Sequence, residues 1–195
     1  MRRRKLPAVL CALALMMVAC EAPKPMFHGV DLTGVDYGRD FALDDPDGRR
    51  VTLETFRGRY VLLFFGFTQC PDVCPTELAR AVDVRRKLGA DGQRLQVVFV
   101  TLDPERDTPE LLREYMRTFD PSFLGLRGGP AQTRATVLEF RAQYEKVPTG
   151  SSYTIAHSAL SYVFDPKGRL RLALKYDQSV DDCVADLQML MKHES

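Results

Sequence analysis

The sequence has little net charge and contains no internal repeat or low-complexity tract. Its 195 residues carry 27 lysines and arginines against 26 aspartates and glutamates, which leaves a net charge of +1. This balance argues against nucleic acid as the main partner. The length and the hydrophobic content of 45% predict a single domain with a sizeable core and short extensions.

The apolar stretch near the N-terminus is shorter than a typical transmembrane helix. The apolar stretch Leu6–Ala19 has fourteen residues, which is short for a transmembrane helix, and it follows the basic run Arg2–Lys5. This arrangement is typical of a secretory signal. Met17–Cys20 resembles the bacterial lipobox, in which the cysteine is lipidated and becomes the mature N-terminus. An ordinary signal peptide cleaved nearby, or an uncleaved anchor, is the alternative.

We therefore expect residues 1–19 to be a lipoprotein signal peptide, with the mature protein anchored to a membrane through lipidated Cys20. The predicted location is the bacterial cell envelope, with the domain facing the periplasm or another extracytoplasmic space. Such a compartment is oxidising.

Cysteine is scarce, with five in the whole chain. Cys11 lies inside the predicted signal and Cys20 is the proposed lipid site, so the mature domain keeps Cys70, Cys74 and Cys183. Cys183 has helical spacing with apolar neighbours and is predicted to be a buried apolar residue. One pair of thiols remains for chemistry.

Residues 20–40 contain several prolines and glycines without steady periodicity, which predicts a tether. A domain over residues 41–195 is expected to follow. Apolar runs predict an edge strand at 50–53, buried strands at 60–67 and 95–102, and a hairpin from 158–164 and 170–176. Helical spacing predicts helices near 75–88, 109–119, 130–144 and 180–191.

A βαβ unit followed by a hairpin and a final helix is the thioredoxin-like order. The predicted fold class is therefore α/β, with a central mixed sheet flanked by helices.

Two thiols, Cys70 and Cys74, come where the first buried strand gives way to a helix. Their spacing places both sulfurs on one side of the first turn, and the helix N-terminus favours ionisation of at least one of them. Asp72 between them opposes that effect. Such a dithiol can cycle through a disulfide or bind a soft metal. The alternative without a chemical function is an inert structural disulfide.

Two departures from a thioredoxin dithiol make pure disulfide exchange the less obvious interpretation. Three residues separate the cysteines, and the chain has no tryptophan to precede the first one. The loop before the predicted hairpin carries His157 in place of the cis-proline expected of a reductase. An imidazole facing two thiolates completes a ligand set that suits copper and, less selectively, zinc. The alternative for His157 is a surface or hydrogen-bonded residue.

Three segments together closely resemble the signatures of the Sco/SenC copper-binding proteins, over a region from about Phe41 to the C-terminus. The segments are Phe65-Gly66-Phe67-Thr68-Gln69-Cys70-Pro71-Asp72-Val73-Cys74-Pro75, Leu102-Asp103-Pro104-Glu105-Arg106-Asp107-Thr108-Pro109, and His157-Ser158.

The resemblance implies a thioredoxin-like chaperone that delivers copper, as Cu(I) or Cu(II), to the dinuclear copper centre on subunit II of cytochrome c oxidase. It implies that Cys70, Cys74 and His157 are the ligands and that Asp103 is a neighbour that modulates binding or transfer. Asp103 also suits a turn and helix-entry position. Further expected partners are another periplasmic copper chaperone and a thioredoxin-like reductant.

Two other functions stay open beside the chaperone. In a thiol-disulfide reductase, Cys70 and Cys74 form the redox dithiol that keeps the target cysteines reduced. In a peroxiredoxin-like peroxidase, a single reactive cysteine would suffice. Arg106 and Asp107 are predicted to anchor their loop and the next helix start, and Tyr153 and Phe67 are candidates for the walls of the site.

Overall fold

The computed structural model describes residues 26–193. The predicted signal peptide and Cys20 lie outside this range. Within it, no helix combines the length and the apolar character needed to cross a membrane.

Ten strands and four α-helices make up the described part. The strands are β1 (Val30–Asp31), β2 (Leu43–Asp44), β3 (Arg50–Val51), β4 (Tyr60–Gly66), β5 (Leu95–Thr101), β6 (Leu124–Leu126), β7 (Tyr144–Thr149), β8 (Ser152–His157), β9 (Leu160–Phe164) and β10 (Leu170–Lys175). The α-helices are α1 (Val73–Leu88), α2 (Pro109–Phe119), α3 (Pro130–Glu139) and α4 (Val180–His193), with 3-10 turns η1 (Leu53–Phe56) and η2 (Gly89–Arg94).

The main sheet has six strands in the order β1-β10-β9-β4-β5-β6. Strands β4, β5 and β6 are parallel, whereas β9 and β10 run antiparallel to their neighbours. The predicted strands at 60–67 and 95–102 are confirmed as β4 and β5, which are buried along their whole length. Continuous burial explains why both strands have largely apolar sequences rather than an alternation of apolar and polar residues.

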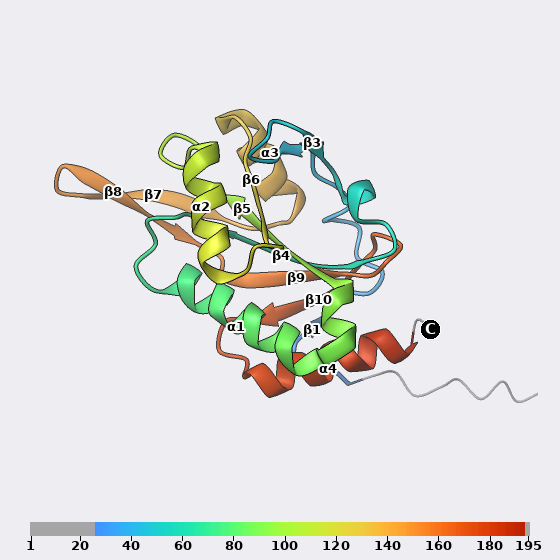
Figure 1. Ribbon diagram of the computed structural model, residues 1–195. Coiled ribbons are helices and arrows are strands. Elements are labelled where there is room, and N and C mark those ends of the chain that lie inside the picture. Colours follow the sequence, from blue (N-terminus) through green and yellow to red (C-terminus); the bar gives the residue numbers. More distant parts are fainter. Residues whose placement is uncertain (1–25, 194–195) are drawn as a thin grey trace, which may run out of the picture.

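Helices cover both faces of this sheet. Figure 1 shows α1 and α4 side by side on one face, where the cavity between them is lined by Phe64 of β4 and Cys183 of α4. On the other face, Phe65 packs against Phe140 at the end of α3, with ring centres 5.3 Å apart. Adjacent residues of β4 thus point to opposite layers, and the predicted mixed sheet flanked by helices is confirmed.

Helix α2 begins as its sequence predicts. Pro109 occupies the first turn, and the Thr108 hydroxyl accepts a hydrogen bond from the Leu111 backbone N–H at 3.2 Å. The side chain satisfies an amide that has no partner inside the helix, and the proline lacks the N–H that would need one.

The packed domain begins earlier than the predicted boundary at Phe41. Val30 and Asp31 form β1 at the edge of the main sheet, and Leu32 is buried. The backbone N–H groups of His28 and Gly29 both donate to the Asp186 carboxylate of α4 at 2.8 Å. Contacts with residues about 140 to 160 positions away hold this segment, so its own proline- and glycine-rich composition could not reveal it.

The predicted helix over 130–144 ends at Glu139 instead. Arg141 adopts a left-handed backbone with φ of 50°, which terminates the helix. The chain then forms the hairpin β7–β8, a separate two-stranded sheet that Figure 1 shows extending away from the main one. Gly150, with φ of 62°, makes its turn. His157 therefore ends a strand of this hairpin rather than lying in a loop.

Candidate metal and thiol site

The two cysteines lie between β4 and α1, at the carboxyl end of a central strand. Cys74 is in the first turn of α1 and is fully buried, whereas Cys70 in the preceding loop is partly exposed. Both are free thiols, as is Cys183. The Cys70 sulfur accepts a hydrogen bond from the Cys74 backbone N–H at 3.4 Å, so both sulfurs are held at the helix start.

Gly66, the last residue of β4, provides the room for the Cys74 sulfur. A Cβ atom at this position would lie 2.6 Å from the Cys74 sulfur and 2.7 Å from the Phe99 ring. Both distances are too short for any side chain. A glycine inside an apolar strand is the signal that this close approach leaves in the sequence.

His157 approaches Cys74 from the hairpin. Its Nε2 atom lies 3.9 Å from the Cys74 sulfur, although 83 residues separate the two along the chain. Its Nδ1 atom lies 2.9 Å from the Ser158 carbonyl oxygen, which can only accept, so Nδ1 carries the proton. Burial lowers the pKa of His157, which favours the neutral ring. The Nε2 lone pair is thus directed at the sulfur, the arrangement of a metal-binding imidazole.

The electrostatics of Cys74 differ from the prediction for a helix N-terminus. Burial is the largest effect and raises the pKa of this thiol well above its usual value, with the neighbouring Cys70 acting in the same direction. The helix dipole contributes less than the loss of hydration costs a thiolate in this position. In the described structure Cys74 is therefore a protonated thiol at neutral pH.

The structure brings Cys74 and His157 together, but the described residues contain no group of three or more histidine, cysteine or acidic side chains arranged to hold a metal. The Cys70 sulfur lies close to Cys74, since it accepts the hydrogen bond from the Cys74 backbone N–H. A three-ligand site therefore requires the three side chains to converge further.

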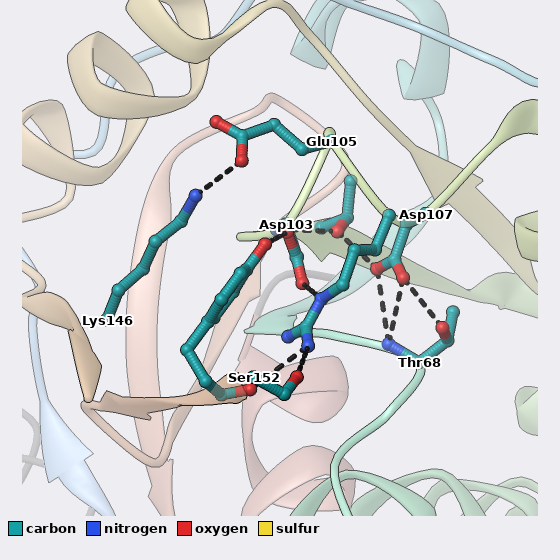
Figure 2. Close-up of polar contacts among 9 residues, drawn as sticks. Thr68, Asp103, Glu105, Asp107, Lys146 and Ser152 are labelled. Carbon is teal, nitrogen blue, oxygen red and sulfur yellow. Dashed lines mark hydrogen bonds and ion pairs between the residues drawn. The ribbon is translucent and has the colours of Figure 1, made fainter. Parts of the chain in front are cut away.

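Asp107 anchors its own loop, as predicted, and it also anchors the loop before the cysteines, which was not predicted. It accepts hydrogen bonds from the backbone N–H of Thr68 at 3.1 Å and from the Thr68 hydroxyl at 2.6 Å, and a further bond from the Thr101 hydroxyl (Figure 2). Burial raises the pKa of Asp107, and these donors oppose the shift.

Asp103 is fully buried and faces the hairpin. Its carboxylate accepts hydrogen bonds from Arg106 and from the Tyr153 hydroxyl, the latter at 2.8 Å. Tyr153 thus contacts Asp103, whereas the Phe67 ring lies edge-on to the His157 ring at 6.3 Å.

Tyr115 of α2 is a neighbour of the site that its sequence position does not reveal. Its ring packs against Phe99, and its buried hydroxyl has no hydrogen-bond partner among the residues that the structure describes. Burial is the main reason that the pKa of Tyr115 is raised, and the nearby Cys74 and Cys70 contribute.

A surface cavity of about 640 Å³ opens beside His157. It lies between α3, which contributes Arg134 and Leu138, and the base of the hairpin at Tyr144. Leu138 is 67% exposed although it is a large apolar side chain. This cavity gives an incoming group room next to the imidazole. Cys183, by contrast, is buried on α4 as predicted, where burial raises its pKa to about 11.

Comparisons with known proteins agree on one family. A family model described as SCO1/SenC matches residues 31–192. An SCO2-like protein of Rickettsia felis is 34% identical over 163 residues, which cover 81% of this chain and 80% of the relative.

Two solved structures show the same fold. ScoI of Bradyrhizobium japonicum with copper bound is 39% identical, with a TM-score of 0.69 over 76% of this chain and 96% of that one. Apo Sco1 of Thermus thermophilus is 42% identical, with a TM-score of 0.76 over 86% of this chain and 99% of that one.

Proposed function

This chain belongs to the SCO1/SenC family, and from that premise we propose that it is a copper chaperone with Cys70, Cys74 and His157 as ligands. The observation that carries the proposal is the 3.9 Å approach of His157 Nε2 to the buried Cys74 sulfur. The copper-bound structure of the related ScoI supports copper as the metal.

The donor set fits copper. Two thiolates are soft ligands that favour Cu(I), and the imidazole also suits Cu(II). Cys74 must lose its proton on loading because only a thiolate binds the metal, so copper binding releases protons and is weaker at low pH. The raised pKa of Cys74 does not prevent this, since the metal ion replaces the proton at the sulfur.

Delivery is proposed to reach the dinuclear copper centre on subunit II of cytochrome c oxidase during its assembly. Transfer then proceeds by ligand exchange with the cysteines and histidine of that centre. Cys70 is the accessible sulfur, so exchange begins there, and His157, which borders an open cavity, is released next. The buried Cys74 is released last.

The test is copper binding by the reduced protein, with Cu(I) and Cu(II) measured separately. We expect one tightly held copper ion and, for Cu(II), a sulfur-to-copper charge-transfer band. His157→Ala should lose tight binding, whereas His28→Ala should not, because His28 is exposed near α4 and pairs with Asp182. Equal copper affinity in the wild type and His157→Ala would refute the ligand assignment, and undiminished copper in Cys70→Ser/Cys74→Ser would refute the chaperone.

A thiol-disulfide reductase is the second candidate, favoured by one observation: Cys70 is an accessible free thiol beside a second free thiol. Its thiolate would attack a client disulfide, and Cys74 would then displace the client thiol to leave a Cys70–Cys74 disulfide and a reduced client. This reaction does not need the imidazole. Disulfide exchange retained in His157→Ala, together with no copper binding by the wild type, would favour the reductase.

We further propose that the chain is a lipoprotein of the bacterial cell envelope, anchored at Cys20 with the domain in the periplasm or another extracytoplasmic space. The basic and apolar N-terminal pattern and the lipobox-like residues support this proposal. Incorporation of labelled fatty acid that is lost in Cys20→Ala is the expected result; unchanged labelling in that variant would contradict it.

A further inference from the structure

The hairpin that carries His157 stands outside the main sheet. Strands β7 and β8 pair with each other in a separate two-stranded sheet, and most of β7 is exposed. A two-stranded hairpin is marginally stable by itself in water. The position of His157 over Cys74 therefore depends on what holds the hairpin against the rest of the domain.

Arg106, in the loop between β5 and α2, contacts the start of β8, the end of that strand opposite to His157. Its Nη1 atom donates to the Tyr153 carbonyl oxygen at 3.0 Å and reaches the Ser152 hydroxyl at 3.5 Å. Its guanidinium lies 3.7 Å from the centre of the Tyr153 ring. These contacts act on two adjacent residues of β8, which stand five and four positions before His157 (Figure 2).

Asp103 fixes both partners of this contact. Its buried carboxylate accepts from Arg106 Nε on one oxygen and from the Tyr153 hydroxyl at 2.8 Å on the other. A planar guanidinium presents several donors in a fixed geometry, which a lysine cannot reproduce. We call Asp103, Arg106 and Tyr153 the hairpin clamp. A surface ion pair between Lys146 of β7 and Glu105, at 2.7 Å, is a second and weaker contact between the hairpin and this loop.

The same loop also holds the cysteine side of the site. Asp107, one residue after Arg106, binds Thr68 two residues before Cys70. The Thr101 hydroxyl links Asp107, which holds the cysteine loop, to Asp103, which holds the hairpin. It donates a hydrogen bond to Asp107 and accepts one from the Asp103 backbone N–H. A single loop, residues 101–107, therefore sets the thiols and the imidazole relative to one another.

We propose that Arg106 is a positioning residue, which acts through Asp103 and Tyr153 to hold His157 at its ligand position without touching the metal. This inference rests on the proposed copper site. It also assigns Asp103 a role through the hairpin instead of through contact with the metal. Outer residues that orient a metal-binding histidine typically change metal affinity by about 10- to 100-fold when they are replaced.

The test compares Arg106→Lys with Arg85→Lys. Arg85 is a matched control, because it pairs with Asp120, donates to the Ser122 hydroxyl and lies over the Phe123 ring, all of them remote from the hairpin. We expect Arg106→Lys to bind Cu(II) about 10- to 100-fold more weakly than the control, with reduced nitrogen hyperfine coupling from His157 in its EPR spectrum. Tyr153→Phe, which removes only the hydroxyl bond to Asp103, should show a smaller change of the same kind.

A metal-free readout separates this proposal from the proposed function. In the reduced apo-protein, amide hydrogen exchange over residues 154–157 should be about tenfold faster in Arg106→Lys than in Arg85→Lys, because charged hydrogen bonds to the hairpin are lost. Unaltered exchange and an unaltered copper spectrum in Arg106→Lys would overturn the clamp while the copper site stands. If the wild type binds no copper, the proposed function fails, and the exchange comparison alone decides whether Arg106 positions the hairpin.

Discussion

Gly66→Ala tests the packing beneath the site most directly. The backbone of Gly66 is that of an ordinary strand residue, so alanine adds a steric effect and little backbone strain. The added carbon would lie 2.6 Å from the Cys74 sulfur and 2.7 Å from Phe99, both fully buried. Overpacking of this kind costs about 1–3 kcal/mol, and one of the two neighbours must move.

Thermal unfolding of the reduced protein measures this cost. In a protein of this length, each kcal/mol lowers Tm by about 2–4 °C, so a clear decrease is expected. Gly129→Ala is the control, because a Cβ there meets nothing nearer than a Gln132 oxygen at 3.7 Å. Its Tm should change less, since alanine is a slightly poorer N-cap but also restricts the unfolded chain.

The copper spectrum then shows which neighbour has moved. Displacement of the Cys74 sulfur would alter the charge-transfer band, whereas displacement of the Phe99 ring would lower Tm and leave the band intact. A Tm within about 1 °C of the wild type, with an unchanged spectrum, would refute the close approach at Gly66.

Three further predictions concern the thiols and the N-terminal segment. In the native reduced protein, a thiol reagent should modify Cys70 well before Cys74 and Cys183, because Cys70 is partly exposed whereas the other two cysteines of the described residues are buried; mass spectrometry of the labelled peptides gives the order, and equal rates would contradict the burial. Since burial raises the pKa of Cys183 to about 11, the unfolded state loses this proton first, and the free energy of unfolding should fall as the pH rises from about 9 to 11; Cys183→Ala should flatten that fall, as measured by urea unfolding. Asp186→Ala removes the acceptor of two backbone N–H groups and should cost about 1–3 kcal/mol, with faster hydrogen exchange at Gly29; full protection there would show that other contacts hold the segment.

The central layer of the fold could be predicted from local patterns because its signals are local. Strand β4 is an unbroken apolar run, and Thr108 and Pro109 are residues typical of a helix start, which predicts where α2 begins. The dithiol and His157 stood out because few cysteines and histidines compete with them among the residues that the structure describes. Proposing these three residues as ligands required residue type and order, not detailed geometry.

Three features could not be predicted because they depend on distant contacts. The hairpin β7–β8 is largely exposed and polar, so it lacks the apolar alternation of a half-buried strand, and its position depends on Arg106. Strand β1 is fixed by β10 and α4 at the other end of the chain. The direction of the pKa shift of Cys74 depends on the depth of burial, which local sequence does not encode.

The unequal burial of the ligands gives the proposed transfer an order. Cys74 and His157 already lie together and are held by independent elements, one by α1 and the other by the clamped hairpin. Of the two thiols, Cys70 is the accessible one, because it is partly exposed whereas Cys74 is buried. A client thiolate can therefore replace Cys70 first without unfolding any element, while Cys74 and His157 retain the metal. Release of the copper then requires the hairpin that carries His157 to move away from Cys74. The contacts of Arg106 with the hairpin would therefore set how readily His157 leaves the metal.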